Sequence, residues 1–181
     1  MISLLPNLGI PAFRSLAGGF RAIIAFSLMV PISPLFAQKP GAAEEKANRV
    51  VRIVTAGDPK RAIEAPKAGL AGSSRTGTGF RLIAGLANPE MFSFESTRSK
   101  GTYLRHHLWK IEVAERPDDP IMQEDFDWEA TFKIVKVEGD VVMLEAGNRP
   151  GEFITIEPEG RYALAPGKNE PLRTQFKLID K

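Results

Sequence analysis

The sequence predicts an all-β protein built from three diverged copies of one unit. Three short segments share one pattern, a Phe followed by a cation and two aliphatic residues: Phe80–Ile83, Phe132–Val135 and Phe176–Ile179. Each begins by alternating apolar and charged residues, as a half-buried strand does. No segment keeps a period of 3.6 residues over three turns, and 16 Gly and 14 Pro interrupt the chain. These observations predict short strands joined by turns, without long helices.

The start of the unit is also recognisable in two of the copies. Glu95 is followed by Gly101 and the aromatic Tyr103, and Glu145 is followed by Gly151 and another aromatic at the same spacing. A strand that runs into a turn accounts for this order of residues, because Gly supplies the turn conformation. The first copy is degenerate and keeps only the strand and its turn.

Three such units, at about 50–88, 89–138 and 139–181, predict a β-trefoil, which is a closed six-stranded barrel capped by three hairpins. The first residue of each Phe segment is then expected in the core. A solenoid is the competing architecture, but it needs tighter, more regular and usually more numerous repeats.

The N-terminal part of the chain is expected to direct export. Arg14 and Arg21 precede an apolar run, Ala22–Val30. The run is shorter than the roughly 20 residues that span a bilayer, but it suits a signal peptide cleaved after Ala37. An uncleaved anchor or a buried helix is the alternative. The predicted organisation is a signal peptide at 1–37, a linker at 38–48 and a folded domain at 49–181 of a secreted or periplasmic protein, with no membrane association after cleavage.

Composition and motifs exclude several functions. The net charge is +2 and no basic block stands out, so nucleic acid is not an expected partner. Cysteine is absent, which rules out disulfides, thiolate chemistry and cysteine zinc sites. No nucleophile elbow, phosphate loop or dinucleotide motif is present, so no enzyme activity and no cofactor are predicted. The acid-rich segment Glu124–Glu129 is expected to be a loop before a core strand.

The middle copy carries a resemblance to a known family. Ser93–Ser96 reads Ser-Phe-Glu-Ser, Gly101–His106 ends in Tyr-Leu-Arg-His, and Glu129–Phe132 reads Glu-Ala-Thr-Phe. These segments resemble the arabinofuranosidase B (AbfB) domain, a carbohydrate-binding module of family 42 with a β-trefoil fold, which repeats Ser-Phe-Glu-Ser, Tyr-Leu-Arg-His and Asp-Ala-Thr-Phe. The resemblance extends over Val50–Lys181 and is specific across Met91–Val135.

The resemblance implies a pocket for an arabinofuranose side chain, lined by His106 and Glu129. The family's Asp is Glu here, one methylene longer, and Asp127 is the alternative acid if the register shifts. The other copies lack these groups, so a single retained pocket is implied. The counterparts of His106 are Ala65 and Ile156, and those of Glu129 are Gly77 and Arg173.

Aromatic residues complete the set of ligand-binding candidates. Trp109 and Trp128 each flank a candidate residue and could stack on a sugar ring, with core packing as the alternative. Tyr103 is a further candidate, although the third copy has Phe in its place, which favours a core role. His106 and His107 point to opposite faces of one strand because neighbouring strand residues alternate, so they do not predict a metal site.

The function expected from this resemblance is that of a secreted module that binds arabinofuranosyl side chains of a polysaccharide, without catalysis and alongside a partner glycoside hydrolase. One pocket implies weak binding, with a dissociation constant roughly between millimolar and tens of micromolar. The alternative is a β-trefoil scaffold for protein interaction, with decayed sugar sites. The family association with α-L-arabinofuranosidase activity is a third interpretation.

Overall fold

The computed structural model describes residues 48–167 and 173–181. All of them belong to one compact unit, Ala37–Lys181. The predicted signal peptide, residues 1–37, and all but the last residue of the predicted linker, 38–48, lie outside the described residues.

The described residues form thirteen strands and one helix. Six of the strands build a barrel: β1 (Arg49–Thr55), β5 (Phe80–Ala84), β6 (Phe92–Ser96), β9 (Phe132–Glu138), β10 (Val141–Ala146) and β13 (Phe176–Asp180). The remaining elements are β2 (Ala62–Glu64), β3 (Gly69–Leu70), β4 (Gly72–Ser74), β7 (Thr102–His107), β8 (Lys110–Glu115), β11 (Glu152–Ile156), β12 (Tyr162–Pro166) and α2 (Pro120–Glu129).

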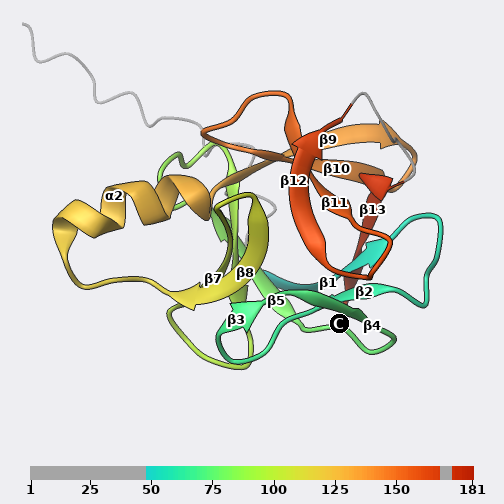
Figure 1. The fold of residues 1–181 in the computed structure, drawn as a ribbon, viewed down its shortest axis with the longest axis horizontal. Coiled ribbons are helices and arrows are strands. Elements are labelled where there is room, and N and C mark those ends of the chain that lie inside the picture. Colours follow the sequence, from blue (N-terminus) through green and yellow to red (C-terminus); the bar gives the residue numbers. More distant parts are fainter. Residues whose placement is uncertain (1–47, 168–172) are drawn as a thin grey trace, which may run out of the picture. The chain divides into compact units, whose positions relative to one another are not determined.

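The six barrel strands close into a ring. β1 pairs with β5, β5 with β6, β6 with β9, β9 with β10, β10 with β13, and β13 returns to β1, all antiparallel (Figure 1). In the closing pair, Ile53 lies opposite Leu178. A closed ring has no free strand edge, because every barrel strand is paired on both sides.

Three hairpins cap the barrel and confirm the β-trefoil prediction. They are formed by β2 with β4, β7 with β8 and β11 with β12. The hairpins also pair with one another, because β8 binds both β3 and β12 and an isolated bridge joins Gly72 to Arg161. The all-β fold class and the trefoil architecture are therefore as the sequence predicted.

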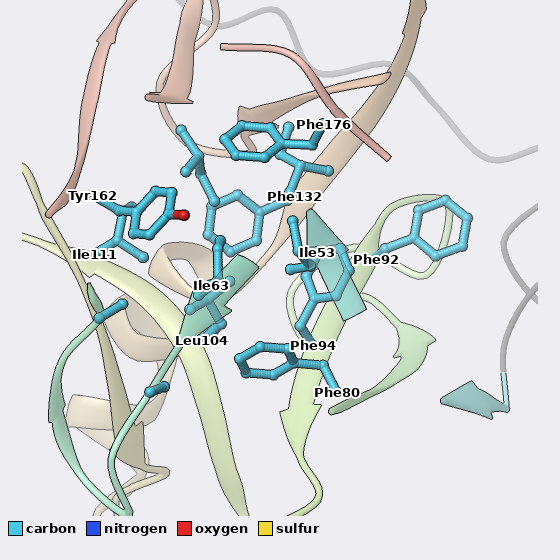
Figure 2. Close-up of a cluster of buried hydrophobic side chains, with 14 of the residues drawn as sticks. Ile53, Ile63, Phe80, Phe92, Phe94, Leu104, Ile111, Phe132, Tyr162 and Phe176 are labelled. Atoms are coloured by element: carbon cyan, nitrogen blue, oxygen red, sulfur yellow. The ribbon is translucent and has the colours of Figure 1, made fainter. Parts of the chain in front are cut away.

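Aromatic side chains fill the barrel, as Figure 2 shows. Phe80, Phe132 and Phe176, which begin the three Phe segments, are fully buried. The Phe94 ring lies between two of them, with ring centroids 6.5 Å from Phe80 and 6.1 Å from Phe132. The next residue in each of these strands points outward, because strand side chains alternate between the two faces. The Phe-cation pattern thus marks the point where each strand enters the core.

The shared Glu-to-Gly spacing also has a structural cause. Glu95 Oε1 accepts a hydrogen bond from the backbone N–H of Gly101 at 2.9 Å, and Glu145 Oε1 accepts one from Gly151 at 2.7 Å. Both glycines have positive φ, 77° and 87°, which a residue without Cβ adopts at little cost. The carboxylate therefore closes the same turn before β7 and before β11.

The helix α2 corrects one expectation. Residues 124–129, predicted to be a loop, form the C-terminal part of α2. Asp119 caps the helix by accepting a hydrogen bond from a first-turn N–H at 2.9 Å, and Pro occupies the first helical position, where its missing N–H is not needed. Phe126 is the one apolar residue that the helix buries, so no apolar stripe was visible in the sequence. No helix among the described residues is long and apolar enough to cross a membrane.

Candidate functional site

The strand β7 presents two different chemistries on its two faces. Leu104 and His106 point into the protein, with His106 only 3% exposed. Tyr103, Arg105 and His107 point outward toward α2, because successive strand residues alternate. The candidate residues therefore lie on both sides of one strand.

The buried face holds a hydrogen bond between two parts of the chain. His106 Nε2 lies 2.7 Å from Oδ1 of Asn148, in the turn between β10 and β11. An amide oxygen only accepts, so Nε2 carries the proton and donates. The positions matched to His106 in the other two copies, Ala65 and Ile156, are buried and apolar. The middle copy thus places a polar side chain where the others place hydrocarbon.

Burial lowers the pKa of His106 below its ordinary value of 6.5. The hydrogen bond to Asn148 and the charge of Glu129 oppose this effect but do not cancel it. His106 is therefore a neutral imidazole at physiological pH, with Nε2–H as donor and Nδ1 as acceptor.

The outer face holds a charged network around Glu129, at the end of α2. Glu129 Oε2 accepts a hydrogen bond from Arg105 Nη1 at 3.1 Å, and Nδ1 of His107 lies 3.4 Å from Glu129 Oε1. Arg105 also binds Glu112, on β8, through Nε at 2.9 Å. The guanidinium lies 4.9 Å from the centroid of the Phe126 ring. Glu129 is thus a half-buried carboxylate that the guanidinium of Arg105 partly neutralises.

The structure brings His107, and not His106, to Glu129. The two imidazoles point to opposite faces of β7, because neighbouring strand residues alternate. That His106 and Glu129 together line a sugar pocket stays a prediction. His106 contacts the third copy instead, through Asn148.

The turn between β7 and β8 is strained and exposed. His107 pairs with Lys110 across the hairpin, so Leu108 and Trp109 are the two central residues of the turn. Their φ angles are 47° and 70°, the left-handed region in which bulky side chains are rare. Leu108 is 75% exposed and Trp109 is 50% exposed. The turn thus holds two large apolar side chains in solvent at a conformational cost, a combination found at functional sites.

A cation fixes the Trp109 ring. The guanidinium of Arg149 lies 4.3 Å from the ring centroid. Arg149 follows Asn148 in the β10–β11 turn, so this one turn contacts both the buried His106 and the exposed Trp109. The tip of the β7–β8 hairpin is therefore held against the third copy at two adjacent points.

Tyr103 and Asp127 have structural partners. Tyr103 packs edge-on against Phe126, with ring centroids 6.3 Å apart, and burial together with the charge of Glu95 raises the pKa of its hydroxyl. Asp127 accepts two hydrogen bonds from Arg116, both at 2.6 Å. These two residues tie α2 to β7 and β8.

The chemistry of this surface is that of polar recognition. It offers the carboxylate of Glu129 beside the imidazole of His107, and the indole of Trp109 in the adjacent turn. In the described part of the chain, no group of three or more His, Cys, Asp or Glu residues could hold a metal ion.

Acidification tests the burial of His106. We expect the free energy of unfolding to fall as pH drops below about 6.5, because the unfolded chain then binds a proton that the folded protein does not. The loss should run from the unfolded pKa down to the lowered folded pKa of His106. Urea unfolding at about pH 7.5 and about pH 5.5 measures it. In His106→Ile, which copies the third unit, the loss should be smaller, and an equal loss would contradict the assignment.

Comparison with known proteins identifies the family to which this fold belongs. The model of the alpha-L-arabinofuranosidase B (ABFB) domain matches residues 53–169. This range includes both faces of β7, the whole of α2 and the β10–β11 turn. The chain belongs to this family. No curated protein sequence matches it.

Solved structures share the fold of this ABFB domain at low identity. A GH54 α-L-arabinofuranosidase soaked with a cyclic sulfate inhibitor is 20% identical, with a TM-score of 0.59 over 74% of this chain and 31% of its own. An arabinofuranosidase complexed with arabinofuranosyl-α-1,2-xylobiose is 19% identical, with a TM-score of 0.60 over the same shares. The chain thus spans about a third of these enzymes. The designed three-fold symmetric protein ThreeFoil is 11% identical, with a TM-score of 0.52 over 73% of this chain and 99% of its own.

Sequence reasoning missed three residues of the candidate site. Asn148 and Arg149 lie in the β10–β11 turn, and nothing local indicates that this turn meets the middle copy. Arg105 lies within the Tyr-Leu-Arg-His segment, and its alternation with His106 was the available signal for its outward position.

Proposed function

We propose that this ABFB domain binds arabinofuranosyl side chains of a polysaccharide at the β7–β8 turn and the adjoining end of α2. The family match over residues 53–169 carries the proposal. The complex of an arabinofuranosidase of the same fold with an arabinofuranosyl-xylobiose supports the choice of ligand.

Each side chain has a distinct role in this proposal. Glu129 accepts hydrogen bonds from sugar hydroxyls, and the exposed face of Trp109 covers the apolar face of the ring. His106 positions the β10–β11 turn through Asn148, so that Arg149 holds the Trp109 ring. Tyr103 and Asp127 support α2 from the protein side. A neutral sugar suits this surface, because Arg105 is shared between Glu112 and Glu129 and the two carboxylates keep a net negative charge that accepts hydroxyl hydrogens and repels anions.

The expected affinity is low. Each hydrogen bond contributes about 0.5–1.5 kcal/mol net, and charge-assisted bonds contribute somewhat more. Three or four of them with ring stacking give about 4–6 kcal/mol, a dissociation constant between millimolar and tens of micromolar. Without further intact sites there is no gain from multivalency.

Affinity electrophoresis tests this proposal. The protein is expected to migrate more slowly in gels that contain arabinoxylan or arabinan than in gels without glycan. Trp109→Ala and Glu129→Gln should each weaken binding about tenfold, since each removes one main contact, and at this low affinity that abolishes detectable retention. Glu138→Gln, an exposed acid on β9, is the matched control and should change nothing. Normal migration of the wild-type protein on every arabinose-bearing glycan would rule the proposal out.

We also propose that the domain has no catalytic activity of its own and acts beside a glycoside hydrolase. The family match covers the ABFB domain alone, and the chain spans 31% of a solved arabinofuranosidase. The purified protein should release no 4-nitrophenol from 4-nitrophenyl α-L-arabinofuranoside. Release that is lost in Glu129→Gln would overturn this statement.

Export remains a proposal of the same kind, supported by Arg14, Arg21 and the apolar run Ala22–Val30. Sequencing the mature N-terminus should find Gln38 as the first residue. Retention of Met1 in an exported or cell-bound protein would contradict cleavage.

A further inference from the structure

A cavity lies on the other side of α2 from the proposed arabinose site. It has a volume of about 360 Å³ and is lined by Ala87, Pro120, Gln123, Glu124, Asp127 and Trp128. The five helical residues are spaced three or four apart, so they share one face of α2. Phe126 and Glu129 lie on the face toward β7, against Arg105. The cavity is therefore separate from the β7–β8 turn.

Hydrogen bonds hold the two walls of this cavity together. One wall is α2 and the other is the loop between β5 and β6. Ala87 N donates to Thr131 Oγ1 at 3.1 Å, and Thr131 Oγ1 donates to the carbonyl of Asp127 at 2.7 Å. Ser93 Oγ accepts a hydrogen bond from Leu86 N at 3.0 Å. It donates one to the carbonyl oxygen of Ala130, which caps the C-terminus of α2, at 2.7 Å. The loop and the helix thus share two buried hydroxyls, which preorganises the cavity.

The loop also fits closely at Gly85. A Cβ at this position would lie 2.5 Å from the carbonyl oxygen of Asn88 and 2.8 Å from a methyl carbon of Thr131. The absence of a side chain at Gly85 is what allows the loop to pack against Thr131. The cavity wall is therefore built, rather than a chance gap beside a loose loop.

Carboxylate and amide oxygens, which accept hydrogen bonds, are the main polar groups that line the cavity. Gln123 directs Nε2 to the carbonyl of Pro117 at 2.8 Å, which leaves its Oε1 to accept. Asp127 is bound by Arg116 through both oxygens, and Glu124 is exposed and makes no ion pair with any described residue. None of the lining residues is a cation. Glu124 and Asp127 would repel an anionic ligand, whereas sugar hydroxyls can donate to the carboxylate and amide oxygens and accept from the indole N–H of Trp128.

The side chain of Trp128 further restricts the class of ligand that fits the cavity. Trp128 is half-buried, and its ring contacts no other aromatic ring and no cation among the described residues. An indole beside hydrogen-bond acceptors suits a sugar. The apolar face of the sugar stacks on the indole, and its hydroxyls donate hydrogen bonds to the neighbouring carboxylate and amide oxygens. The volume lies near the lower end of the range of about 300–1,000 Å³ for ligand pockets, which suits a short oligosaccharide.

We propose that this cavity, hereafter the Trp128 groove, is a second carbohydrate subsite that takes a neutral pyranose segment of a glycan main chain. Trp128 stacks on the sugar ring, and Glu124 and Gln123 accept its hydroxyls. The proposal rests on the proposed function only for the class of ligand, since Gln123, Glu124 and Trp128 take no part in the arabinose site.

The chain offers a direct measurement, because Trp109 and Trp128 are its two tryptophans. Trp109→Phe leaves Trp128 as the sole tryptophan, and Trp128→Phe leaves Trp109, so that tryptophan emission reports one site at a time. The probe is xylotriose, which carries no arabinose, titrated into the full chain. We expect a saturable change in Trp128 emission with a millimolar half-point and no change in Trp109 emission.

A matched pair of acid variants identifies the groove. In the Trp109→Phe background, Glu124→Gln should raise the half-point about three- to tenfold, and Glu138→Gln, on β9, should leave it unchanged. Thermal melts confirm that each variant is folded. An unchanged Trp128 emission at the highest soluble xylotriose concentration overturns the proposal, as does a response that Glu124→Gln leaves intact.

Different results would contradict the arabinose site and the Trp128 groove. Retention on arabinan lost in Trp109→Ala, with no xylotriose response at Trp128, would leave the arabinose site and remove the groove. A xylotriose response at Trp128 without retention on any arabinose-bearing glycan would do the reverse.

Discussion

Replacing Phe132 by alanine is expected to lower the free energy of unfolding by about 3–5 kcal/mol. Phe132 is fully buried, and its ring packs on Phe94 with centroids 6.1 Å apart (Figure 2). It also joins strands on both sides, since it lies opposite Phe92 of β6 and Ala146 of β10. Truncation therefore opens a cavity at the junction of two units. Urea unfolding followed by far-ultraviolet circular dichroism measures the change.

The control is a Phe outside the barrel core. Phe153, on β11, is half-buried, so Phe153→Ala should cost clearly less than Phe132→Ala. Phe80→Ala and Phe176→Ala should cost about as much as Phe132→Ala, because both are equally buried. Equal losses at Phe153 and Phe132 would show that the barrel interior does not dominate stability.

The second large effect is expected at the β7–β8 turn. Changing Leu108→Asn together with Trp109→Gly should raise the free energy of unfolding by about 1–2 kcal/mol and abolish retention on arabinan. Bulky residues cost about 1–2 kcal/mol each in the left-handed region, and Asn-Gly is the preferred pair for a two-residue hairpin turn. The lost contact between Arg149 and the Trp109 ring, worth about 0.5–1 kcal/mol, offsets part of the gain. Thermal or urea unfolding and affinity electrophoresis read out the two effects.

Leu108→Asn alone separates stability from binding. It relieves one of the two strained positions and keeps the Trp109 ring, so part of the gain should remain and retention should persist. A less stable double variant would contradict strain in the turn. A stable double variant that still binds arabinan would exclude Trp109 from the site.

Local patterns predicted the barrel well. Phe80, Phe132 and Phe176 each stand first in an alternating segment, and alternation alone states which side chains enter the core. The Glu-to-Gly spacing was readable because the contact it reports, from Glu95 to Gly101, is made within a single turn. Features that depend on neighbours in sequence were therefore available before the structure.

Features that depend on contacts between units could not be predicted from the sequence. The bond from His106 to Asn148 joins the second and third copies, and no periodicity of either segment indicates it. The helix α2 escaped notice for a different reason. It buries little besides Phe126, so its one usable signal was the Asp119 cap with Pro120 behind it. The Trp128 groove lies between this helix and a loop distant in sequence. It could not be predicted from the sequence, because the helix was not recognised and its contact with the loop leaves no local pattern.

The pairing of β1 with β13 that closes the barrel also constrains how the protein is made. During synthesis β1 leaves the ribosome early, but one of its two barrel neighbours consists of residues 176–180. Until those residues emerge, β1 has an unpaired edge and the interior around Ile53 is open on that side. The barrel thus completes only after translation of its last strand, which makes folding depend on contacts distant in sequence and therefore slow. The nascent chain is accordingly exposed to aggregation for most of its synthesis, and a chaperone that shields strand edges would act in that interval.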